Sequence, residues 1–386
     1  DLLLNNNSIT ASNVNSDAHA TGVSVTAQFS AAGLAGGLSL ANTSGVATTL
    51  VQGLDGGEGN DLIHNNGNVD LSGTATADAL SIALNISASV GLGGGAAITD
   101  ASSTAQSTVF GINGGNGFDD ITNAGEIDVT ANAVTESTSA SVGITVAIGA
   151  DATLADAESK ATSTAIGIYD PGGDEPEPDD DPCGKGGHNQ QQSQSECHHH
   201  NDDPPQSQLA NLGAINATAT ADSEGLAISG NLLGYALGET TNTSTADAAG
   251  IRFDQGPAFI YNEGPITANS SATAEGLSVA VTLGGYAVGD TSTTANASAS
   301  GIESGDGDDK VFNIASSEDA TINVDARSYA SGESISVGLI GVQEANTTNT
   351  ANASATGINT GAGDDEVLND AVMIVSAGNP LTADGS

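Results

Sequence analysis

One short motif, Asn-x-Gly-x-Ile-x-Ala or a close variant, recurs along the chain and constrains its fold more than any other feature. The copies begin at Asn5, Asn65, Asn123, Asn211 and Asn262, with weaker forms at Asn313 and Asn369. They are separated by 60, 58, 88, 51, 51 and 56 residues. A fixed period of this kind is typical of a solenoid or a repeat array. The chain therefore divides into six units of about 55 residues and the start of a seventh.

A second motif, a Gly followed by Ile or Leu, closes each unit. It falls at Gly53, Gly111, Gly167, Gly250, Gly301 and Gly357. Within the units, apolar residues alternate with polar ones, which is the pattern of a β-strand. We therefore expect an all-β protein, a repetitive β-solenoid of flattened, stacked coils of about 55 residues. Units one to three occupy residues 1–169, and the later units occupy residues 209–386.

The alternation changes phase partway through most units. In unit two the apolar positions are first odd and then even: Val69, Leu71, Ala75, Ala77 and Ala79, followed by Leu80, Ile82, Leu84 and Ile86. Units three to six change at an equivalent point, whereas unit one keeps one parity from Ile9 to Val25. Because successive side chains in a strand point to opposite faces, a shared phase change predicts a bulge or corner of the stacked coils.

The size of a unit limits its shape. About 55 residues at roughly 3.3 Å each give a perimeter of roughly 180 Å. An open coil of that size would enclose a lumen too wide for Ala and Ser to fill, since packed sheets lie only about 10 Å apart. Each coil must therefore be flattened, or each unit must form two smaller coils.

Composition and charge narrow the class of protein. The chain has 51 Gly, no Trp and 3% aromatic residues, so any interior must be built from small side chains. Its 48 acidic and 5 basic residues give a net charge of −43, which repels nucleic acid and anionic lipid and attracts divalent cations. Charge alone would favour disorder, or a salt-adapted surface, but the regular period favours stacked sheets. No apolar run of 18 residues occurs, so we expect no transmembrane helix.

Four windows fit the nine-residue pattern Gly-Gly-x-Gly-x-Asp-x-U-x, where U is a large apolar residue. Residues 56–64 and 114–122 match in full, and residues 304–312 and 360–368 differ only at the first position. These windows resemble the RTX (repeats-in-toxin) family of secreted calcium-binding proteins, and the chain as a whole is similar to secreted bacterial β-strand-repeat proteins of surface fibres and adhesins. The resemblance implies Ca²⁺ as ligand, with backbone carbonyls offered at the glycines and a carboxylate at the sixth position. The implied metal-site residues are Gly57, Gly59, Asp61, Gly115, Gly117, Asp119, Gly305, Gly307, Asp309, Gly361, Gly363 and Asp365.

The windows depart from that family because they are not in tandem. With one coil per unit, successive loops would lie about 4.8 Å apart and could share an ion. With two coils per unit they would lie about 9.6 Å apart, too far for calcium–oxygen bonds of about 2.4 Å to span. The alternative is that the Gly-Asp sequences only form turns, because these residues favour positive φ. Unit four lacks the motif, and we expect no ion there.

Residues 170–208 form an acidic insert, rich in Pro, Gln and His, where the loop of unit three should be. Its composition is typical of disorder. Outside the cell, Cys183 and Cys197 would form a disulfide that closes a loop of 15 residues. With His188 and the run His198–His200 they could instead bind zinc or copper, or they could remain free thiols.

No catalytic pattern such as Gly-x-Ser-x-Gly or His-Glu-x-x-His occurs, so we expect the protein not to be an enzyme. Two functions remain. One is a structural subunit of an extracellular filament, sheath or surface layer, stabilised by calcium. The other is a segment of a large secreted adhesin that binds a cell-surface or polysaccharide ligand. Short loops outside the insert favour the structural role.

The two ends of the sequence predict contact between copies. The stretch DLLLNNN from Asp1 aligns with DLIHNNG from Asp61, so the chain starts, without Met, at the sixth position of a nonapeptide. Joined to the final TADGS, it would complete a loop from Gly385, Asp1 and Leu3. Open sheet edges recruit further strands. We therefore expect head-to-tail association, either of separate subunits or of successive segments of one longer chain.

Overall fold

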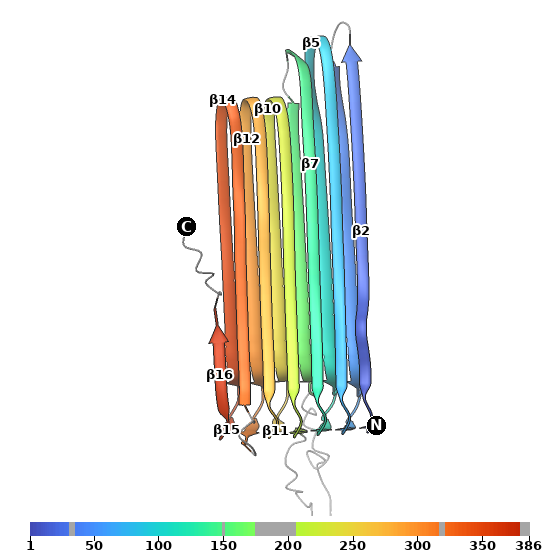
Figure 1. Cartoon of the computed structure of the whole chain (residues 1–386), viewed down its shortest axis with the longest axis vertical. Helices are drawn as coiled ribbons and strands as arrows, with labels where there is room; N and C mark the ends of the chain where they lie inside the picture. The colour runs from blue at the N-terminus through green and yellow to red at the C-terminus, as the bar shows by residue number, and fades with distance from the viewer. Residues whose placement is uncertain (31–34, 149–150, 174–205, 316–320, 379–386) are drawn as a thin grey trace, which may run out of the picture.

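The computed structural model describes residues 1–30, 35–148, 151–173, 206–315 and 321–378. In these residues the protein is all-β, with parallel strands that run along its long axis (Figure 1). The long strands are β2 (Ile9–Ser30), β3 (Ala35–Asp55), β5 (Val69–Asn113), β7 (Ile127–Ile148), β8 (Asp151–Asp170), β10 (Ile215–Phe253), β12 (Ile266–Glu303) and β14 (Thr321–Asn359). The short strands are β1 (Leu2–Asn5), β4 (Leu62–Asn65), β6 (Asp120–Asn123), β9 (Ser207–Asn211), β11 (Ala258–Asn262), β13 (Lys310–Asn313), β15 (Glu366–Asn369) and β16 (Val372–Ala377).

The longest strand elements, β5, β10, β12 and β14, turn back on themselves, whereas β2, β3, β7 and β8 each form a single limb. In β10, residues 215–231 pair with β7, and residues 234–253 pair with β8. The reversal contains Gly234, which stacks on Gly285 and Gly341, and all three have φ between 133° and 136°. A unit therefore consists of an ascending limb, a reversal at the tip, a descending limb and a short strand at the base. The short strands form their own sheet, in the order β1-β4-β6-β9-β11-β13-β15.

Parallel pairing places equivalent residues of successive units side by side. Ile127 pairs with Val69 on one side and with Ile215 on the other, and Ile215 pairs in turn with Ile266. The longer step between units three and four does not disturb this register, because the extra residues fall in sequence after the end of β8 and before the start of β9. The predicted insert, residues 170–208, overlaps both strands at its ends, since Asp170 belongs to β8 and Gln208 belongs to β9.

Each unit can be divided into a base half, next to the short strands, and a tip half, next to the reversal. The two sequence motifs meet in the core of the base half. Ile215, Ile266 and their partners begin the ascending limbs, are fully buried and pack across the interior against the glycines that end the descending limbs. A Cβ atom on Gly250 would lie 2.2 Å from Cγ2 of Ile266. Only glycine leaves room for the isoleucine, which explains why the Gly-Ile motif recurs once per unit.

The asparagine that opens the first motif is also buried in every unit from Asn5 to Asn313, whereas Asn369 at the end of the stack is exposed. Each of these side chains donates from Nδ2 to Oδ1 of the next, at 2.6–2.7 Å. This asparagine ladder runs through Asn5, Asn65, Asn123, Asn211, Asn262, Asn313 and Asn369. A buried amide must have its hydrogen bonds satisfied, and the ladder does this with residues of one type stacked in register.

The predicted bulge or corner at the phase change is wrong. In β5 the odd positions stay buried from Val69 through Ser87, with no change at Ala79. The strand continues without a break, and what changes is the type of residue on each face. Beyond Ala79 the inward positions carry Ser, Ala and Asn, whereas Leu80 and Ile82 point outward. The tip half therefore has a polar interior and an apolar exterior.

Hydrogen bonds between the limbs pair many of the polar side chains inside the tip half, although both carboxylate oxygens of the buried Asp151 have no partner among the described residues. Ser103 Oγ lies 2.7 Å from Ser137 Oγ, Ser139 Oγ donates to Thr99 Oγ1 at 2.6 Å, and Asn231 Nδ2 donates to the carbonyl of Asp151 at 2.6 Å. Such small side chains let the two sheets approach closely, as the scarcity of large apolar residues requires.

A β-bulge explains why unit one keeps a single parity in sequence. The register between β2 and β5 shifts between Ala11 and Val14, and Asn13 adopts a φ of 60°. After the bulge Val23 pairs with Ile82. The extra residue thus moves Val23 to the outward face, in line with the apolar residues of the other units.

Candidate metal site

The four nonapeptide windows form the turns that lead from the descending limbs into the base strands. All eight predicted ligand glycines adopt positive φ, from 68° at Gly361 to 158° at Gly363. Loops of neighbouring units touch: Glu58 bridges to Asn116, and Asn116 to Gly172. The loops of units one and two are thus spatial neighbours although 58 residues separate Asp61 from Asp119 in sequence.

The sixth-position aspartates point along the stack and cap backbone amides. Oδ1 of Asp119 accepts from the amide of Asp61 at 2.8 Å, and Oδ1 of Asp365 accepts from the amide of Asp309 at 3.0 Å. Oδ1 of Asp309 accepts from the amide of Ala258 at 2.8 Å. Each predicted carboxylate ligand except that of Asp61 therefore has one oxygen engaged by the neighbouring unit.

A cation would bind the second carboxylate oxygen, Oδ2, of the buried aspartates. Oδ2 of Asp119 and Oδ2 of Asp309 are buried without a hydrogen-bond partner among the described residues. Burial raises the pKa of each of these carboxyls to about 6. A buried carboxylate oxygen without a partner is unfavourable unless a proton or a cation neutralises it. In this respect the aspartates fit a hard cation such as calcium.

Asp170 belongs to the same site, although the motif did not identify it. It occupies the first position of the unit-three loop, beside Gly114, and is fully buried. Its Oδ1 accepts from the amide of Gly172 at 2.8 Å, and its Oδ2 has no partner in the described part of the chain. Burial, with smaller contributions from the charges of Asp119 and Asp254, raises its pKa to about 7. The feature of the sequence that could have identified Asp170 is its position: at the first position of the loop the other units have a small residue or, in unit four, Phe253.

The carboxylates do not gather into a complete metal site by themselves. Within the described residues, no group of three or more His, Cys, Asp or Glu side chains is placed to hold an ion. Calcium takes six to eight oxygens, so backbone carbonyls and water would have to supply most of its ligands here. The predicted disulfide Cys183–Cys197 and its neighbouring histidines lie outside the described residues.

The N-terminal residue is aligned with this column of aspartates, as the sequence predicts. The carbonyl of Asp1 accepts from the amide of Leu62 at 2.9 Å, and its ammonium group lies 2.7 Å from Oδ1 of Asp61. The other half of the predicted junction, Gly385 with its neighbours, lies outside the described residues.

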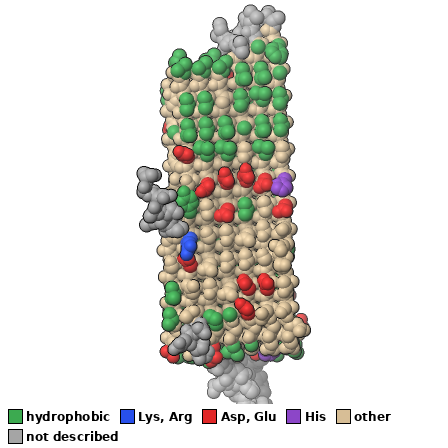
Figure 2. Space-filling model, viewed as in Figure 1, with side chains coloured by type: hydrophobic (Ala, Val, Ile, Leu, Met, Phe, Trp, Pro, Cys, Tyr) green, Lys and Arg blue, Asp and Glu red, His purple; other side chains and the backbone are tan. Residues whose placement is uncertain are grey.

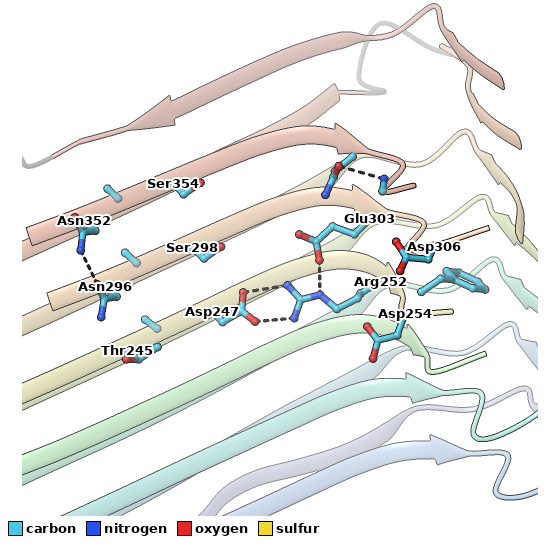
Figure 3. A pocket seen from close by; sticks show the side chains of 17 residues that line it. Thr245, Asp247, Arg252, Asp254, Asn296, Ser298, Glu303, Asp306, Asn352 and Ser354 are labelled. Atoms are coloured by element: carbon cyan, nitrogen blue, oxygen red, sulfur yellow. Dashed lines mark hydrogen bonds and ion pairs between the residues drawn. The ribbon is translucent and has the colours of Figure 1, made fainter. Parts of the chain in front are cut away.

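A polar groove of about 730 Å³ lies on the descending limbs of units four to six (Figure 3). Arg252 on its wall is held by Asp247, with nitrogen–oxygen distances of 2.6 and 3.0 Å, and by Glu303. Its charge is therefore neutralised within the protein. The rest of the lining combines hydroxyl, amide and carboxylate groups, including Asn296 and Asp306, with the apolar side chains of Ala246, Phe253, Ala297 and Ala353.

Comparison of the chain with family models, with curated proteins and with solved structures finds no match. Among the described residues there is no helix with the length and hydropathy needed to cross a membrane.

Proposed function

We propose that the protein is a structural subunit of an extracellular filament, sheath or surface layer, whose copies or successive segments associate head to tail. In this proposal each unit is one flattened coil, since residues one unit apart pair directly. The observation that carries the proposal is the exposed core at the two ends of the stack. Met373 continues the buried isoleucine column beyond Ile322, yet 40% of its surface is exposed.

The asparagine ladder gives such a contact its direction. The ladder has a direction, because every Nδ2 donates to the asparagine of the next unit toward the C-terminus. Asn369 at one end could donate to Asn5 of the next copy and extend the ladder without a change of geometry. A contact between two different ends does not close on itself, so it would yield a filament.

Electron microscopy and light scattering of the purified protein test this proposal. We expect filaments from the unmodified chain and short particles from Met373→Lys, because a charge would enter the core column at the junction. Ile374→Lys is the matched control, since Ile374 is the next residue of β16 and pairs with the outward Asn323. Isolated particles from the unmodified chain at every concentration, or filaments from Met373→Lys, would refute the proposal.

Calcium is the second part of the proposal, and it rests on the unpaired buried oxygens of Asp119 and Asp309. A bound cation would neutralise these carboxylates and reduce the repulsion among 48 acidic groups. We expect calcium to raise the melting temperature and a chelator to lower it. Asp119→Ala should weaken calcium binding more than Asp254→Ala, because only Asp119 lies in an intact nonapeptide. An unchanged melting temperature and strand signal would remove calcium from the proposal.

The polar groove is the observation that favours the alternative function, an adhesin segment. Its amides, hydroxyls and carboxylates are groups that hydrogen-bond to sugars. Binding of surface polysaccharides that is lost in Asp306→Ala and Asn352→Ala, in a chain that forms no filaments, would support this alternative.

A further inference from the structure

Most outward positions of the ascending limbs are apolar in the tip half. This apolar face covers the outward positions from Leu80 to Ile86 and the positions paired with them in the other units. Its polar members lie in the row of Leu80, which also contains Thr21, Thr138 and Glu333. One of its rows runs across the stack through Val25, Leu84, Val142, Gly230, Val281 and Val337. Figure 2 shows such rows as green bands across the upper part of the molecule. Val25 is 63% exposed and Val337 is 52% exposed, so nothing in the described chain covers them.

The apolar face is larger than the patches that single proteins usually expose. Four rows about 6.6 Å apart and six columns about 4.8 Å apart span roughly 700 Å², of which roughly an eighth belongs to the polar positions in the row of Leu80. Apolar patches on monomers rarely exceed a few hundred Å². A stable interface between two proteins buries about 800 Å² on each partner. The face therefore has the area of one side of a complete interface.

The face also has a shape that a second sheet would fit. Gly230 interrupts the row between Val142 and Val281, and a groove of about 510 Å³ follows this gap along neighbouring apolar residues. A flat sheet face with such a gap is suited to sheet-on-sheet packing, in which side chains of two faces interlock at a separation of about 10 Å.

The charges around the face argue against a lipid surface and restrict the orientation of a protein partner. An acidic row borders the lower margin and contains Asp78, Glu136, Glu224 and Glu275 (Figure 2). This row repels anionic headgroups, and the sheet edges at β2 and β16 would leave backbone groups unsatisfied in hydrocarbon. Two copies packed in parallel would also bring their acidic rows together. An antiparallel pair keeps each acidic row away from the other.

We propose that the apolar face is a lateral interface between two copies of this chain, packed face to face and antiparallel with their tip halves overlapping. The contact is related by a two-fold axis, so it is distinct from the head-to-tail contact and does not depend on it. Salt should strengthen it, because the net charge of −43 opposes any association of copies. If filaments form, the same contact would join neighbouring filaments.

Sedimentation velocity of the full chain carrying Met373→Lys tests this interface without head-to-tail growth. We expect a dimer that salt strengthens. Ile228→Lys with Val281→Lys should weaken it by more than about tenfold, because two charges would be buried without partners. Ile228→Thr with Val281→Thr, which keeps strand propensity, should weaken it less. The matched control is Thr243→Lys with Thr294→Lys, two outward positions on the descending limbs of the same strands.

Three results would overturn the proposal. The first is a monomer at concentrations well above the micromolar range. The second is equal dissociation by the control pair, measured on variants with unchanged circular dichroism. The third is capture of the monomer by neutral phosphatidylcholine vesicles that the Ile228→Lys and Val281→Lys pair abolishes, which would assign the face to lipid instead.

Discussion

The base half and the tip half of each unit use the same strands but place their apolar side chains on opposite faces. In β7, Ile127 and Val129 point inward and are fully buried, whereas Val142 and Ile144 point outward and are partly exposed. The base interior is closed by isoleucine columns, and the tip interior by hydroxyl groups. Because burial of one such apolar side chain stabilises by about 1.5–3 kcal/mol, folding free energy should be concentrated in the base half. The tip half keeps apolar side chains partly exposed on its outer face.

Truncation of one isoleucine in each half should give the largest contrast. Ile215→Ala removes a fully buried side chain in the middle of the stack and should lower the free energy of unfolding by about 2–5 kcal/mol. Ile228→Ala changes an outward side chain of the same strand and should cost less than about 1 kcal/mol. Urea unfolding measures both. Equal losses would mean that the two halves do not differ as described.

Charged groups in the base interior should make stability depend on pH. Burial raises the pKa of Asp170 to about 7, whereas an unfolded Asp titrates near 3.9, so the folded state binds more protons between these pH values. The free energy of unfolding should therefore fall as pH rises from about 4 to about 7, and the contribution of Asp170 should then stay constant. Asp170→Asn should remove this loss, by at most about 4 kcal/mol at pH 7.5.

Thermal unfolding in chelator at several pH values tests the effect of Asp170. Asp70→Asn is the control, because Asp70 is an exposed residue of the same half. Stability that rises with pH over this interval in the unmodified chain, or a pH profile that Asp170→Asn leaves unchanged, would contradict the assignment.

The asparagine ladder should contribute less than the isoleucine column beside it. Asn211 accepts from Asn123 and donates to Asn262 and to the carbonyl of Gly213. Asn211→Ala leaves these buried groups without a partner, which should cost about 1–3 kcal/mol. Asn66→Ala removes an exposed hydrogen bond to Asn6 and should cost less than about 0.5 kcal/mol. Similar melting temperatures for the two variants would show that the ladder is not a stabilising feature.

The sequence predicted an all-β stack, because its period can be read directly from the repeat. It left open whether successive loops would be neighbours or two coils apart, and in the structure the loops of units one and two touch. It did not predict which face the tip residues use. The switch from Ala79 to Leu80 has the same pattern whether the strand bends or the solvent side becomes apolar, and only the burial of Ser81 distinguishes these cases. Asp170 was missed because its burial depends on Asp119 and Gly114, which are neighbours only after the units stack.

The smallest loss of unfolding free energy should come from substitutions in the polar interior of the tip half. One such substitution, Ser to Ala, already occurs at the paired position of a neighbouring unit. Ser139 pairs in register with Ala227, so an alanine at this position is accommodated one unit away. Ser139→Ala removes the hydrogen bond to Thr99, but Thr99 Oγ1 also donates to the carbonyl of Leu154 at 3.3 Å and keeps a partner. The loss in unfolding free energy should therefore be below about 1 kcal/mol. Ser139→Val should cost more, because the limbs are too close for the added volume. If both variants unfold like the unmodified chain, the tip interior is loosely packed and only the base half is a true core.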